Sequence, residues 1–342
     1  MTRPLRWSIL GTGNIARQFA ASFSTAVRGS LSAVGSRQTP SAQAFAQAYR
    51  VPQSFGSYEE AIAAPAVDAV YVSLPNSMHR EWTIRALKAG KHVLCEKPIA
   101  ADHAEAQEMF DVAERSGRVL MEAFMYRSHP QTLAVAEAVR SGKIGRLKLI
   151  RSSFCFRVWN TANNIRFDRA MAGGALMDIG CYCLNFSRMI AGAEPSALHA
   201  VGQLHASGVD ELAAGVMQFP GGVAASFTCG MNAQADNGAS ICGDEGYIDI
   251  PVPWKPPEKG ATWSLAYSTP PKMDQGKGAA VAARPKESFS VDAGKALYAL
   301  EADDFAEAVL DGKPLRVSRE DTLGNMQALD TLRTMIGVSW KG

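Results

Sequence analysis

Short apolar runs alternate with stretches of helical periodicity over roughly the first third of the chain. The apolar runs have the length of strands and lie at residues 7–10, 31–34, 69–73, 92–95 and 118–121. Helical stretches separate them at 15–23, 41–49, 77–89 and 102–116, and the last two end at Gly90 and Gly117. Strands that are apolar on both faces and joined by helices form parallel sheets with right-handed crossovers. The pattern therefore predicts a doubly wound α/β domain.

After about residue 146, period-two alternation appears in several β-rich runs. These runs lie at 147–156, 197–204, 212–219 and 223–229, with turn chemistry between the last two at Pro220, Gly221 and Gly222. Helical stretches lie at 176–190, 296–310 and 321–336. We therefore predict an α+β domain with an open, mainly antiparallel sheet, and place the two domains at 1–123 and 124–342. Residues 251–285 are rich in Pro, Lys and Gly, which predicts a long surface excursion with little regular structure.

Length, charge and cysteine content argue against several classes of protein but do not identify a function. The 342 residues suit two domains, and a formal charge of +2 gives no reason to expect nucleic acid or an anionic membrane as partner. The first apolar stretch, about five residues long, is too short for a signal peptide or a membrane span. The six cysteines are scattered, and Cys181 and Cys183 lack a second pair. We therefore expect buried, reduced thiols in a cytoplasmic protein, and neither Cys nor His spacing predicts a metal site.

A glycine-rich segment follows the first predicted strand and opens the first helix. It has the spacing of a dinucleotide-binding loop and reads Gly11, Thr12, Gly13, Asn14, Ile15 and Ala16. Gly11 permits the tight turn, Gly13 lets the backbone approach a pyrophosphate, and Ala16 takes the place of the third glycine. The helix N-terminus then offers free N–H groups to the anion. The alternative is a glycine-rich turn without a ligand.

The residues after the second predicted strand bear on the choice between NAD and NADP. An NAD site places an acid there to accept from the ribose 2′-hydroxyl, about 20 residues past the loop. This chain has Ser36 and Arg37 instead. Arg37 can pair with a 2′-phosphate and lie flat on the adenine, while Ser36 can donate to the phosphate. We therefore predict NADP, unless Arg37 is only a solvated surface arginine.

Polar residues follow three predicted strands at their carboxyl ends, where open α/β sheets bind ligands. The segments are 73–79, with the sequence SLPNSMH, then Glu96-Lys97-Pro98, and then 122–127, with the sequence EAFMYR. Pro98 restricts Lys97 to extended backbone, which fixes the direction of its side chain. In the second domain, Asp178 and Tyr182 are four residues apart and share one helix face after Gly173 and Gly174. Such a pair alone is more often a packed surface pair than a site.

Together these motifs resemble the glucose–fructose oxidoreductase / inositol dehydrogenase (Gfo/Idh/MocA) family over nearly the whole chain. The resemblance rests on GTGNIA at 11–16, ALKAGKHVLCEKP at 86–98 and GGALMDIGCY at 173–182. Inositol dehydrogenases have histidine where this chain has Tyr182. The tyrosine, with segments 122–127 and 164–168, is similar to the branch of dimeric dihydrodiol dehydrogenases and NADP-dependent D-xylose dehydrogenases.

The resemblance implies a Rossmann domain, a second-domain sheet used for substrate binding and dimerisation, and catalysis by Lys97, Asp178 and Tyr182. It also places residues beside the cofactor, namely Ser73, Leu74, Pro75, Asn76, His79 and Glu96. For Asn76 the alternative is a helix cap, at that residue or at Ser77, and Glu96 is more naturally a structural partner of Lys97. Trp159 and Arg166 are candidates for sugar contacts, or equally for packing or dimer contacts. We expect a homodimer or a dimer of dimers.

The chemistry expected of such a site is hydride transfer between the nicotinamide and a hydroxyl or carbonyl carbon of a sugar, polyol or trans-dihydrodiol. A free tyrosine has a pKa of about 10, and we expect the Lys97 ammonium to lower it so that Tyr182 exchanges the proton. Lys97 would also hold the nicotinamide ribose and a substrate hydroxyl, and Asp178 would anchor a neighbouring hydroxyl. Two alternatives remain: a glycoside-processing lyase or hydrolase that uses a bound nicotinamide transiently, and a non-catalytic cofactor-binding sensor.

Overall fold

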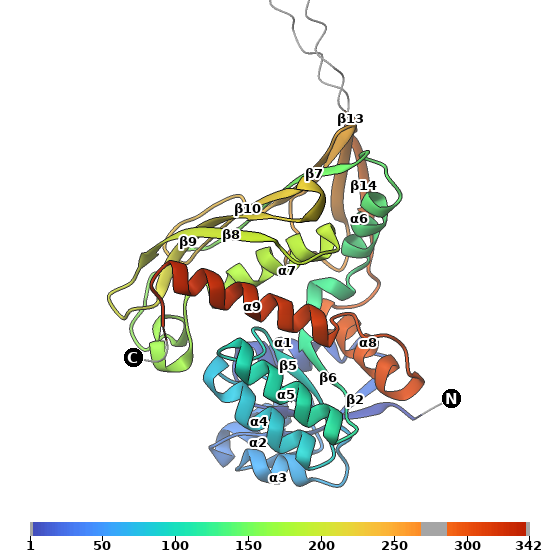
Figure 1. Ribbon diagram of the computed structural model, residues 1–342. Helices are drawn as coiled ribbons and strands as arrows, with labels where there is room; N and C mark the ends of the chain where they lie inside the picture. Colours follow the sequence, from blue (N-terminus) through green and yellow to red (C-terminus); the bar gives the residue numbers. More distant parts are fainter. Residues whose placement is uncertain (1–2, 268–285, 340–342) are drawn as a thin grey trace, which may run out of the picture.

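The computed structural model describes residues 3–267 and 286–339, which form two stacked domains (Figure 1). The first domain is built on a parallel six-stranded sheet with the order β3-β2-β1-β4-β5-β6. Its strands are β1 Leu5–Leu10, β2 Gly29–Gly35, β3 Gln53–Phe55, β4 Ala69–Val72, β5 His92–Glu96 and β6 Leu120–Ala123. The predicted doubly wound domain is confirmed, and the short edge strand β3 is the one that the apolar pattern missed.

Helices connect these strands at the predicted places. They are α1 Asn14–Ser22, α2 Thr39–Tyr49, α3 Tyr58–Ala63, α4 Asn76–Lys88 and α5 His103–Arg115. Gly90 and Gly117, at φ +77° and +61°, follow α4 and α5, which is the left-handed geometry that ends a helix before the next strand. Only α3, which is six residues long, lay outside the prediction.

The second domain carries a mixed sheet of eight strands with the order β14-β13-β12-β11-β7-β10-β9-β8. Its strands are β7 Leu147–Cys155, β8 Ala197–Leu204, β9 Asp210–Gln218, β10 Ala224–Gly230, β11 Ala239–Gly243, β12 Gly246–Ile250, β13 Ala261–Tyr267 and β14 Glu287–Val291. Neighbouring strands are antiparallel except for the β7–β10 pair. This confirms the predicted open, mainly antiparallel sheet.

The prediction of little regular structure for 251–285 holds for residues 251–260, which form no helix or strand, and is wrong for β13 at Ala261–Tyr267. Trp254 is buried, and β13 pairs with β12 and β14 while Trp263 and Leu265 point into the core. Pro, Lys and Gly in the flanking segments obscured this alternation. Residues 268–285 lie outside the described residues.

The remaining helices are α6 Pro130–Arg140, α7 Cys181–Ala191, α8 Leu297–Asp311 and α9 Arg319–Met335, with one π-helical turn, Leu176–Gly180, before α7. Of these, α8 and α9 join the two domains, while α6 and α7 pack within the second. Helix α8 returns to the first domain, where Phe305 packs 5.2 Å from Trp7 and Asp303 accepts from the backbone N–H groups of Val27 and Arg28. Helix α9 packs against both α5 and α7. The chain end therefore fixes one domain against the other.

All six cysteines are free, and all but the partly exposed Cys242 are buried. Across residues 3–267 and 286–339, no helix combines the length and the apolar character needed to cross a membrane. The same residues contain no group of three or more His, Cys, Asp or Glu side chains arranged to hold a metal ion.

Candidate active site

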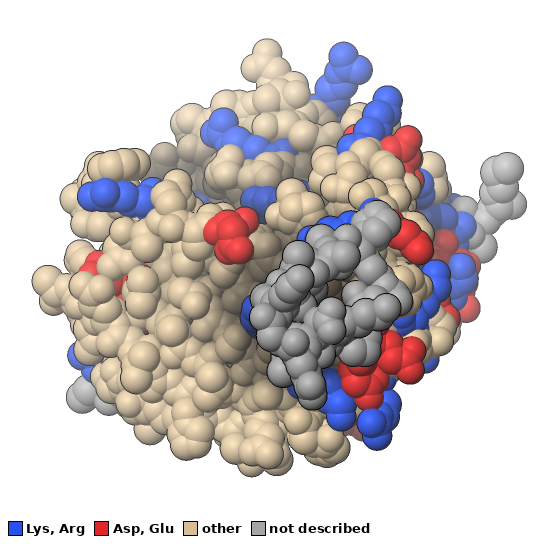
Figure 2. Space-filling model, turned by 90° about the horizontal axis from the view of Figure 1, so that it is seen from above, with Lys and Arg blue, Asp and Glu red and all other residues tan. Residues whose placement is uncertain are grey.

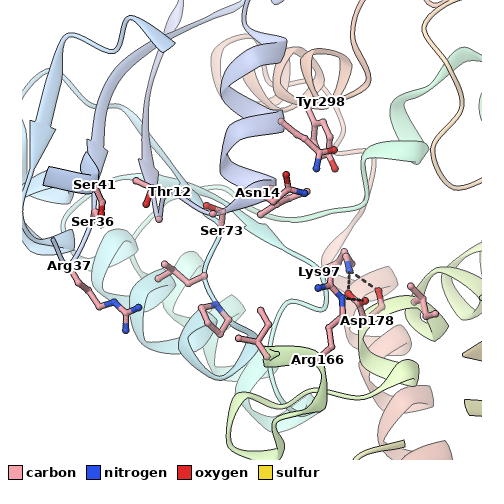
Figure 3. A pocket seen from close by; sticks show the side chains of 18 of the residues that line it. Thr12, Asn14, Ser36, Arg37, Ser41, Ser73, Lys97, Arg166, Asp178 and Tyr298 are labelled. Carbon is pink, nitrogen blue, oxygen red and sulfur yellow. Dashed lines mark hydrogen bonds and ion pairs between the residues drawn. The ribbon is translucent and has the colours of Figure 1, made fainter. Parts of the chain in front are cut away.

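A cavity of about 750 Å³ runs between the two domains (Figure 3). The first domain contributes the glycine-rich loop, the residues after β2 and β4, and Lys97. The second domain contributes the end of β7, the segment around Arg166, the turn that precedes α7, and Lys255. The lining residues include Gly11, Gly13, Ser36, Arg37, Ser41, Lys97, Phe154, Arg166, Asp178, Tyr182, Lys255 and Tyr298.

The glycine-rich loop has the space and the free donors that a dinucleotide needs. Gly11 adopts φ +101°, and a Cβ there would lie 3.1 Å from the Ser73 carbonyl oxygen. A side chain at this position is therefore disfavoured both by the backbone conformation and by the close contact. At Gly13 nothing lies within 4 Å of the place that a Cβ would take, so the loop is open towards the cavity. Helix α1 begins without a side-chain cap and without an acidic residue in its first turn. Its N–H groups are therefore available to a pyrophosphate.

Ser36 and Arg37 line the opposite end of the cavity from Lys97 (Figure 3). Arg37 is exposed and lies beside Tyr58, which also lines the cavity. Ser41, in the first turn of α2, completes this end. Sequence reasoning missed Ser41 and Tyr58, because only the fold brings the first turn of one helix and the start of another beside Arg37.

Lys97 and Asp178, which are 81 residues apart in sequence, meet at the other end of the cavity (Figure 3). Lys97 Nζ donates to the Asp178 backbone oxygen at 2.7 Å and to Asp178 Oδ1 at 3.3 Å. Arg166 Nε donates to the other carboxylate oxygen, Oδ2, at 2.6 Å. One carboxylate therefore holds two cations in place.

This shared ion pair sets the charge of its members. Burial alone would lower the pKa of Lys97, but the Asp178 carboxylate raises it above its ordinary value. Burial alone would raise the pKa of Asp178, but Lys97 and Arg166 hold it below its ordinary value. Lys97 is therefore an ammonium and Asp178 a carboxylate at neutral pH.

Two glycines explain why Arg166 reaches Asp178. A Cβ at Gly173 would overlap the Arg166 carbonyl oxygen, and one at Gly174, where φ is +115°, would overlap Asp210 Oδ1. The Gly174 N–H donates to the Arg166 oxygen at 2.8 Å, and Asp210 Oδ2 accepts from the Leu176 N–H at 2.6 Å. The two glycines thus let the chain approach the Arg166 segment and Asp210 closely, and this fixes the start of the helix that carries Asp178.

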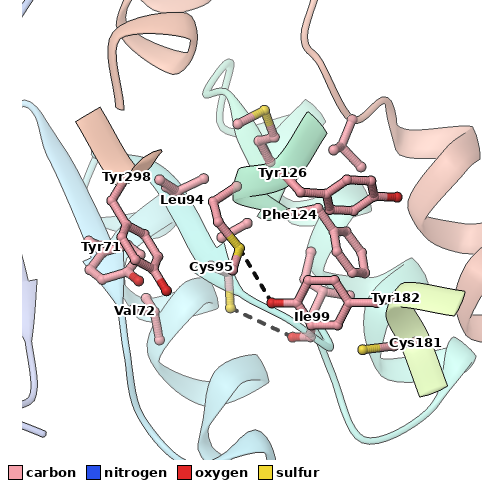
Figure 4. Close-up of a cluster of buried hydrophobic side chains, with 14 of the residues drawn as sticks. Tyr71, Val72, Leu94, Cys95, Ile99, Phe124, Tyr126, Cys181, Tyr182 and Tyr298 are labelled. Carbon is pink, nitrogen blue, oxygen red and sulfur yellow. Dashed lines mark hydrogen bonds between the residues drawn. The ribbon is translucent and has the colours of Figure 1, made fainter. Parts of the chain in front are cut away.

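Tyr182 lines the cavity, but its hydroxyl is not placed as we expected (Figure 4). Lys97 Nζ lies over the tyrosine ring, 5.1 Å from its centre, and the hydroxyl donates to Met125 Sδ at 3.4 Å. Burial, followed by the neighbouring Tyr298 and Glu96, raises the pKa of Tyr182 well above its ordinary value. The expectation of a lowered pKa is wrong, because the hydroxyl is desolvated among aromatic rings and faces other acidic groups. Tyr182 is a neutral phenol.

Glu96 and His79, both expected beside the cofactor, support the Lys97 loop from behind the cavity wall. Glu96 accepts from the Tyr71 hydroxyl and, at 3.2 Å, from the Lys97 N–H. His79 is fully buried, and its ring nitrogens lie 2.9 Å from the Pro98 oxygen and 2.8 Å from the Leu74 oxygen. Neither residue lines the cavity. They hold the segments that do.

Asn76 is likewise outside the cavity lining. Its Nδ2 donates to the Ala172 backbone oxygen at 2.9 Å and so joins the start of α4 to the second domain. The alternative of a helix cap is not seen, since Pro75 occupies the N-cap of α4 without a side-chain bond.

Of the two candidate sugar contacts, the structure places only Arg166 in the cavity. The Trp159 side chain is 80% exposed and outside the lining, with the Arg157 guanidinium 3.9 Å above its ring.

Several lining residues escaped sequence reasoning. Phe154 and Phe156 alternate on and just after β7, Tyr298 lies in the first turn of α8, and Lys255 follows the buried Trp254. The alternation of the two phenylalanines was a usable signal, because inward-facing residues at the end of a strand line whatever cavity the sheet covers. Lys255 lies in a segment without regular structure, so no periodicity marked it as facing the cavity.

Comparison with known proteins agrees with this architecture. A model of an oxidoreductase family with an NAD-binding Rossmann fold matches residues 5–124, and the GFO/IDH/MocA C-terminal domain matches residues 132–249. Trans-1,2-dihydrobenzene-1,2-diol dehydrogenase of Homo sapiens is 37% identical over 258 residues, 74% of this chain and 77% of the relative. D-xylose 1-dehydrogenase (NADP(+)) 2 of Haloferax volcanii is 32% identical over 328 residues, 96% of each chain.

A solved structure is similar over almost the full length. A 3-ketoreductase from Actinomadura kijaniata, in complex with NADP and TDP-benzene, has a TM-score of 0.85 at 30% identity and covers 98% of each chain. The resemblance inferred from GTGNIA, the EKP segment and the GGALMDIGCY segment is confirmed, including the branch. The chain belongs to the Gfo/Idh/MocA family of oxidoreductases with a Rossmann domain that binds a nicotinamide dinucleotide.

Proposed function

We propose that this oxidoreductase uses NADP(H) to transfer a hydride between the nicotinamide and a hydroxyl or carbonyl carbon of a sugar, polyol or trans-dihydrodiol. The observation that carries the proposal is the Lys97 ammonium held by Asp178 in a cavity continuous with the glycine-rich loop. Two relatives are named for a trans-dihydrodiol and for D-xylose, which are the substrate classes proposed here.

The cofactor, when bound, supplies or accepts the hydride. Lys97 has three N–H donors, of which two are used on Asp178, so one remains for a substrate oxygen. That positive charge stabilises negative charge developing on the oxygen during carbonyl reduction. Asp178 keeps the ammonium in position and anchors a neighbouring hydroxyl.

The neutral Tyr182 phenol is suited to donating the proton in the reducing direction. Its only hydrogen-bond acceptor among the described residues is the Met125 thioether, a weak acceptor that competes poorly with a substrate oxygen. The raised pKa of Tyr182 thus changes the proposed form of the residue, from a tyrosinate base to a phenol acid, and leaves its role in proton transfer intact.

The preference for NADP rests on Arg37 with Ser36 and Ser41. Together they place a guanidinium and two hydroxyls at one end of the cavity, and none of the described residues lines that end with a carboxylate. This set matches a 2′-phosphate better than a 2′-hydroxyl.

We also propose a homodimer through the uncovered face of the second-domain sheet. Helices α7 and α9 pack against β7 and β8 on the inner face. On the outer face Val201 is 74% and Val216 is 52% exposed, and they alternate with inward residues on paired strands. Viewed from the side of this domain, a broad area carries few charged side chains (Figure 2). Light scattering should show a dimer, and V201E combined with V216E should give a monomer; an unchanged mass contradicts this interface.

The test of the function is a screen of sugars, polyols and dihydrodiols with NADP and with NAD, followed by the absorbance of the reduced nicotinamide. Lys97→Ala should lower kcat by about 100-fold or more while NADP binding is retained. Lys148→Ala, at an exposed lysine of β7, is the matched control. Near wild-type turnover in Lys97→Ala would refute the catalytic assignment. Substrate consumption without a net absorbance change would instead support the transient-redox alternative.

A further inference from the structure

Lys255 is a cation in the cavity that the proposed hydride transfer does not use. It lines the cavity, its side chain is exposed, and none of the described residues forms an ion pair or hydrogen bond with its ammonium. The Lys255 ammonium interacts electrostatically with the charges of Lys97, Asp178, Arg166 and Glu96. Lys255 therefore lies at the end of the cavity that holds Lys97, away from the end that holds Arg37. Partial burial, and then the Lys97 charge, lower the pKa of Lys255.

The backbone around Lys255 is held by three side-chain bonds, so the point from which the Lys255 side chain starts is defined. Gln131 Nε2 donates to the Val252 oxygen at 3.0 Å. Trp254 Nε1 donates to the Ser153 oxygen at 2.8 Å, and the buried indole packs against Phe154 and Tyr182. His129 Nε2 lies 3.2 Å from the Pro257 oxygen. Lys255 therefore lines the cavity from a segment whose backbone is anchored to the rest of the domain.

Positive charges outnumber negative ones at this end of the cavity. Lys97, Arg166 and Lys255 are cations, and Asp178 is the one carboxylate among the described residues that line the cavity. Glu96 lies behind the cavity wall, and burial raises its pKa, so it offsets less of this positive charge than an exposed carboxylate would. Both of its oxygens are engaged, one by Lys97 and the other by Arg166. The remaining guanidinium nitrogens of Arg166 and the whole Lys255 ammonium keep donors for a ligand. An oxidised nicotinamide would add a further positive charge.

We propose that the substrate carries an anionic group, a carboxylate or a phosphate, held by Lys255 and Arg166 beside the carbon that reacts at Lys97. The inference rests on the proposed hydride transfer and names its substrate class: an acidic or phosphorylated sugar derivative, in preference to a neutral sugar, polyol or diol. An anion there offsets the surplus positive charge, and charge-assisted hydrogen bonds to a guanidinium and an ammonium fix its orientation. Phe154, Phe156 and Ile165 give apolar walls for the carbon skeleton.

The experiment compares glucose, glucuronate and glucose 6-phosphate by calorimetric titration into the NADPH-loaded protein at constant ionic strength. We expect glucuronate or glucose 6-phosphate to bind about 10- to 100-fold more tightly than glucose, the range of a charged hydrogen bond. The two anions separate a carboxylate subsite from a phosphate subsite. Binding of both anions within twofold of glucose overturns the proposal.

Variants test whether Lys255 is responsible. K255Q should remove most of the anion preference, K255R should retain it, and K259Q, at an exposed lysine four residues on and outside the cavity, should behave as wild type. The affinity for NADPH should change less than about twofold in K255Q, since the cofactor phosphates bind at the glycine-rich loop and Arg37. An anion preference that persists in K255Q, or a matching loss of NADPH affinity, overturns the assignment.

Turnover, measured in parallel by nicotinamide absorbance, separates this inference from the proposed function. Neutral sugars oxidised as efficiently as their acidic counterparts would refute the anionic substrate and leave hydride transfer standing. Tight anion binding without turnover of any sugar, polyol or diol would refute hydride transfer and leave the anion subsite standing.

Discussion

Replacing Asp178 by asparagine tests the electrostatic centre of the site with little change in side-chain volume. The carboxylate lies 3.3 Å from Lys97 Nζ and 2.6 Å from Arg166 Nε, and the side chains of Lys97 and Asp178 are only 13% and 18% exposed. In the variant the amide still offers an oxygen acceptor, and the Asp178 backbone oxygen, 2.7 Å from Lys97 Nζ, is unaffected. The negative charge between the two cations is lost, together with one of the two side-chain acceptors.

The magnitude follows from the geometry. Two unit charges at the 3.3 Å separation attract by about 5 kcal/mol at an effective dielectric of 20, which is an upper limit for the pair. Removing one partner of a buried ion pair costs about 3–5 kcal/mol, and the partial exposure of both side chains places Asp178→Asn near the lower figure, about 3 kcal/mol of unfolding free energy. Misplacement of the ammonium should lower kcat/KM by on the order of 100-fold.

The pH dependence identifies the group responsible. The Asp178 carboxylate raises the pKa of Lys97 against the lowering effect of burial. Without that carboxylate the ammonium is the less favoured form, so the pKa of Lys97 falls and activity that needs the ammonium is lost at lower pH. The basic limb of the kcat/KM profile should therefore move towards neutral pH in Asp178→Asn.

Asp168→Asn is the matched control, since Asp168 is an exposed carboxylate near Arg166 in sequence that caps a backbone N–H at Ala170. It should leave the basic limb in place. A basic limb that stays at its wild-type position in Asp178→Asn, despite lower activity, would show that Lys97 is not the group that titrates in catalysis.

Three further predictions follow from the same contacts. Gly174→Ala combines φ +115° with overlap on the Asp210 carboxylate and should lower the free energy of unfolding by about 3–5 kcal/mol in denaturant titrations. The control Gly192→Ala, at φ +64° with nothing within 4 Å of the added Cβ, should lower it by about 1 kcal/mol. Equal losses in the two variants would refute the steric argument. Arg37→Ala should raise the Kd for NADP by about 10-fold or more and that for NAD little, and a parallel rise in both would refute the 2′-phosphate contact. Burial raises the pKa of Asp210 from 3.8 to about 6, so the native state binds the proton more tightly than the unfolded state. Stability should therefore fall by about 2 kcal/mol as pH rises from 4 to 6, out of about 3 kcal/mol over the whole titration of this group, and Asp210→Asn should remove that slope in unfolding titrations.

The nucleotide-binding half could be predicted because its signals are local. Each apolar run overlaps one strand, α4 and α5 are each followed by a glycine, and the order of the elements fixes the handedness of the crossovers. Once the sheet is parallel, Gly11, Ser36 and Lys97 must lie along one edge, since they all follow the carboxyl ends of strands. Their convergence needs no knowledge of packing.

In the second domain, strands β7 to β10 were predicted, but β11 to β14 were not, because they are short and carry small polar residues. In β11 and β12, Ser240, Asp249 and Tyr247 alternate with buried isoleucines, but each run is only five residues long. Residue Trp254 stands among prolines, and its burial depends on the rings of Phe154 and Tyr182, which are far away in sequence. No pattern within a short stretch of the sequence indicates contacts between residues so far apart in the chain.

The orientation of Tyr182 shows the same limit at the level of chemistry. Its place on one helix face with Asp178 is a matter of spacing, and the structure brings both to the cavity. Whether Lys97 meets the hydroxyl or the ring face depends on how Phe124, Phe154 and Trp254 pack around that ring. A pKa inferred from a nearby cation alone therefore had the wrong sign, because the desolvation of the hydroxyl outweighs a charge that lies over the ring.

Net charge and local charge also give different answers about the partner of this protein. A formal charge of +2 over 342 residues is close to neutral and excludes nothing about a small ligand. The cavity concentrates Arg37, Lys97, Arg166 and Lys255 around one carboxylate, Asp178, and these cations come from four separate parts of the chain. Because low-dielectric walls strengthen charges inside a cleft, this local surplus acts on a bound ligand far more than the surface charges do. The phosphates of a dinucleotide account for the cations at one end of the cavity, so the surplus at the other end is evidence about the substrate.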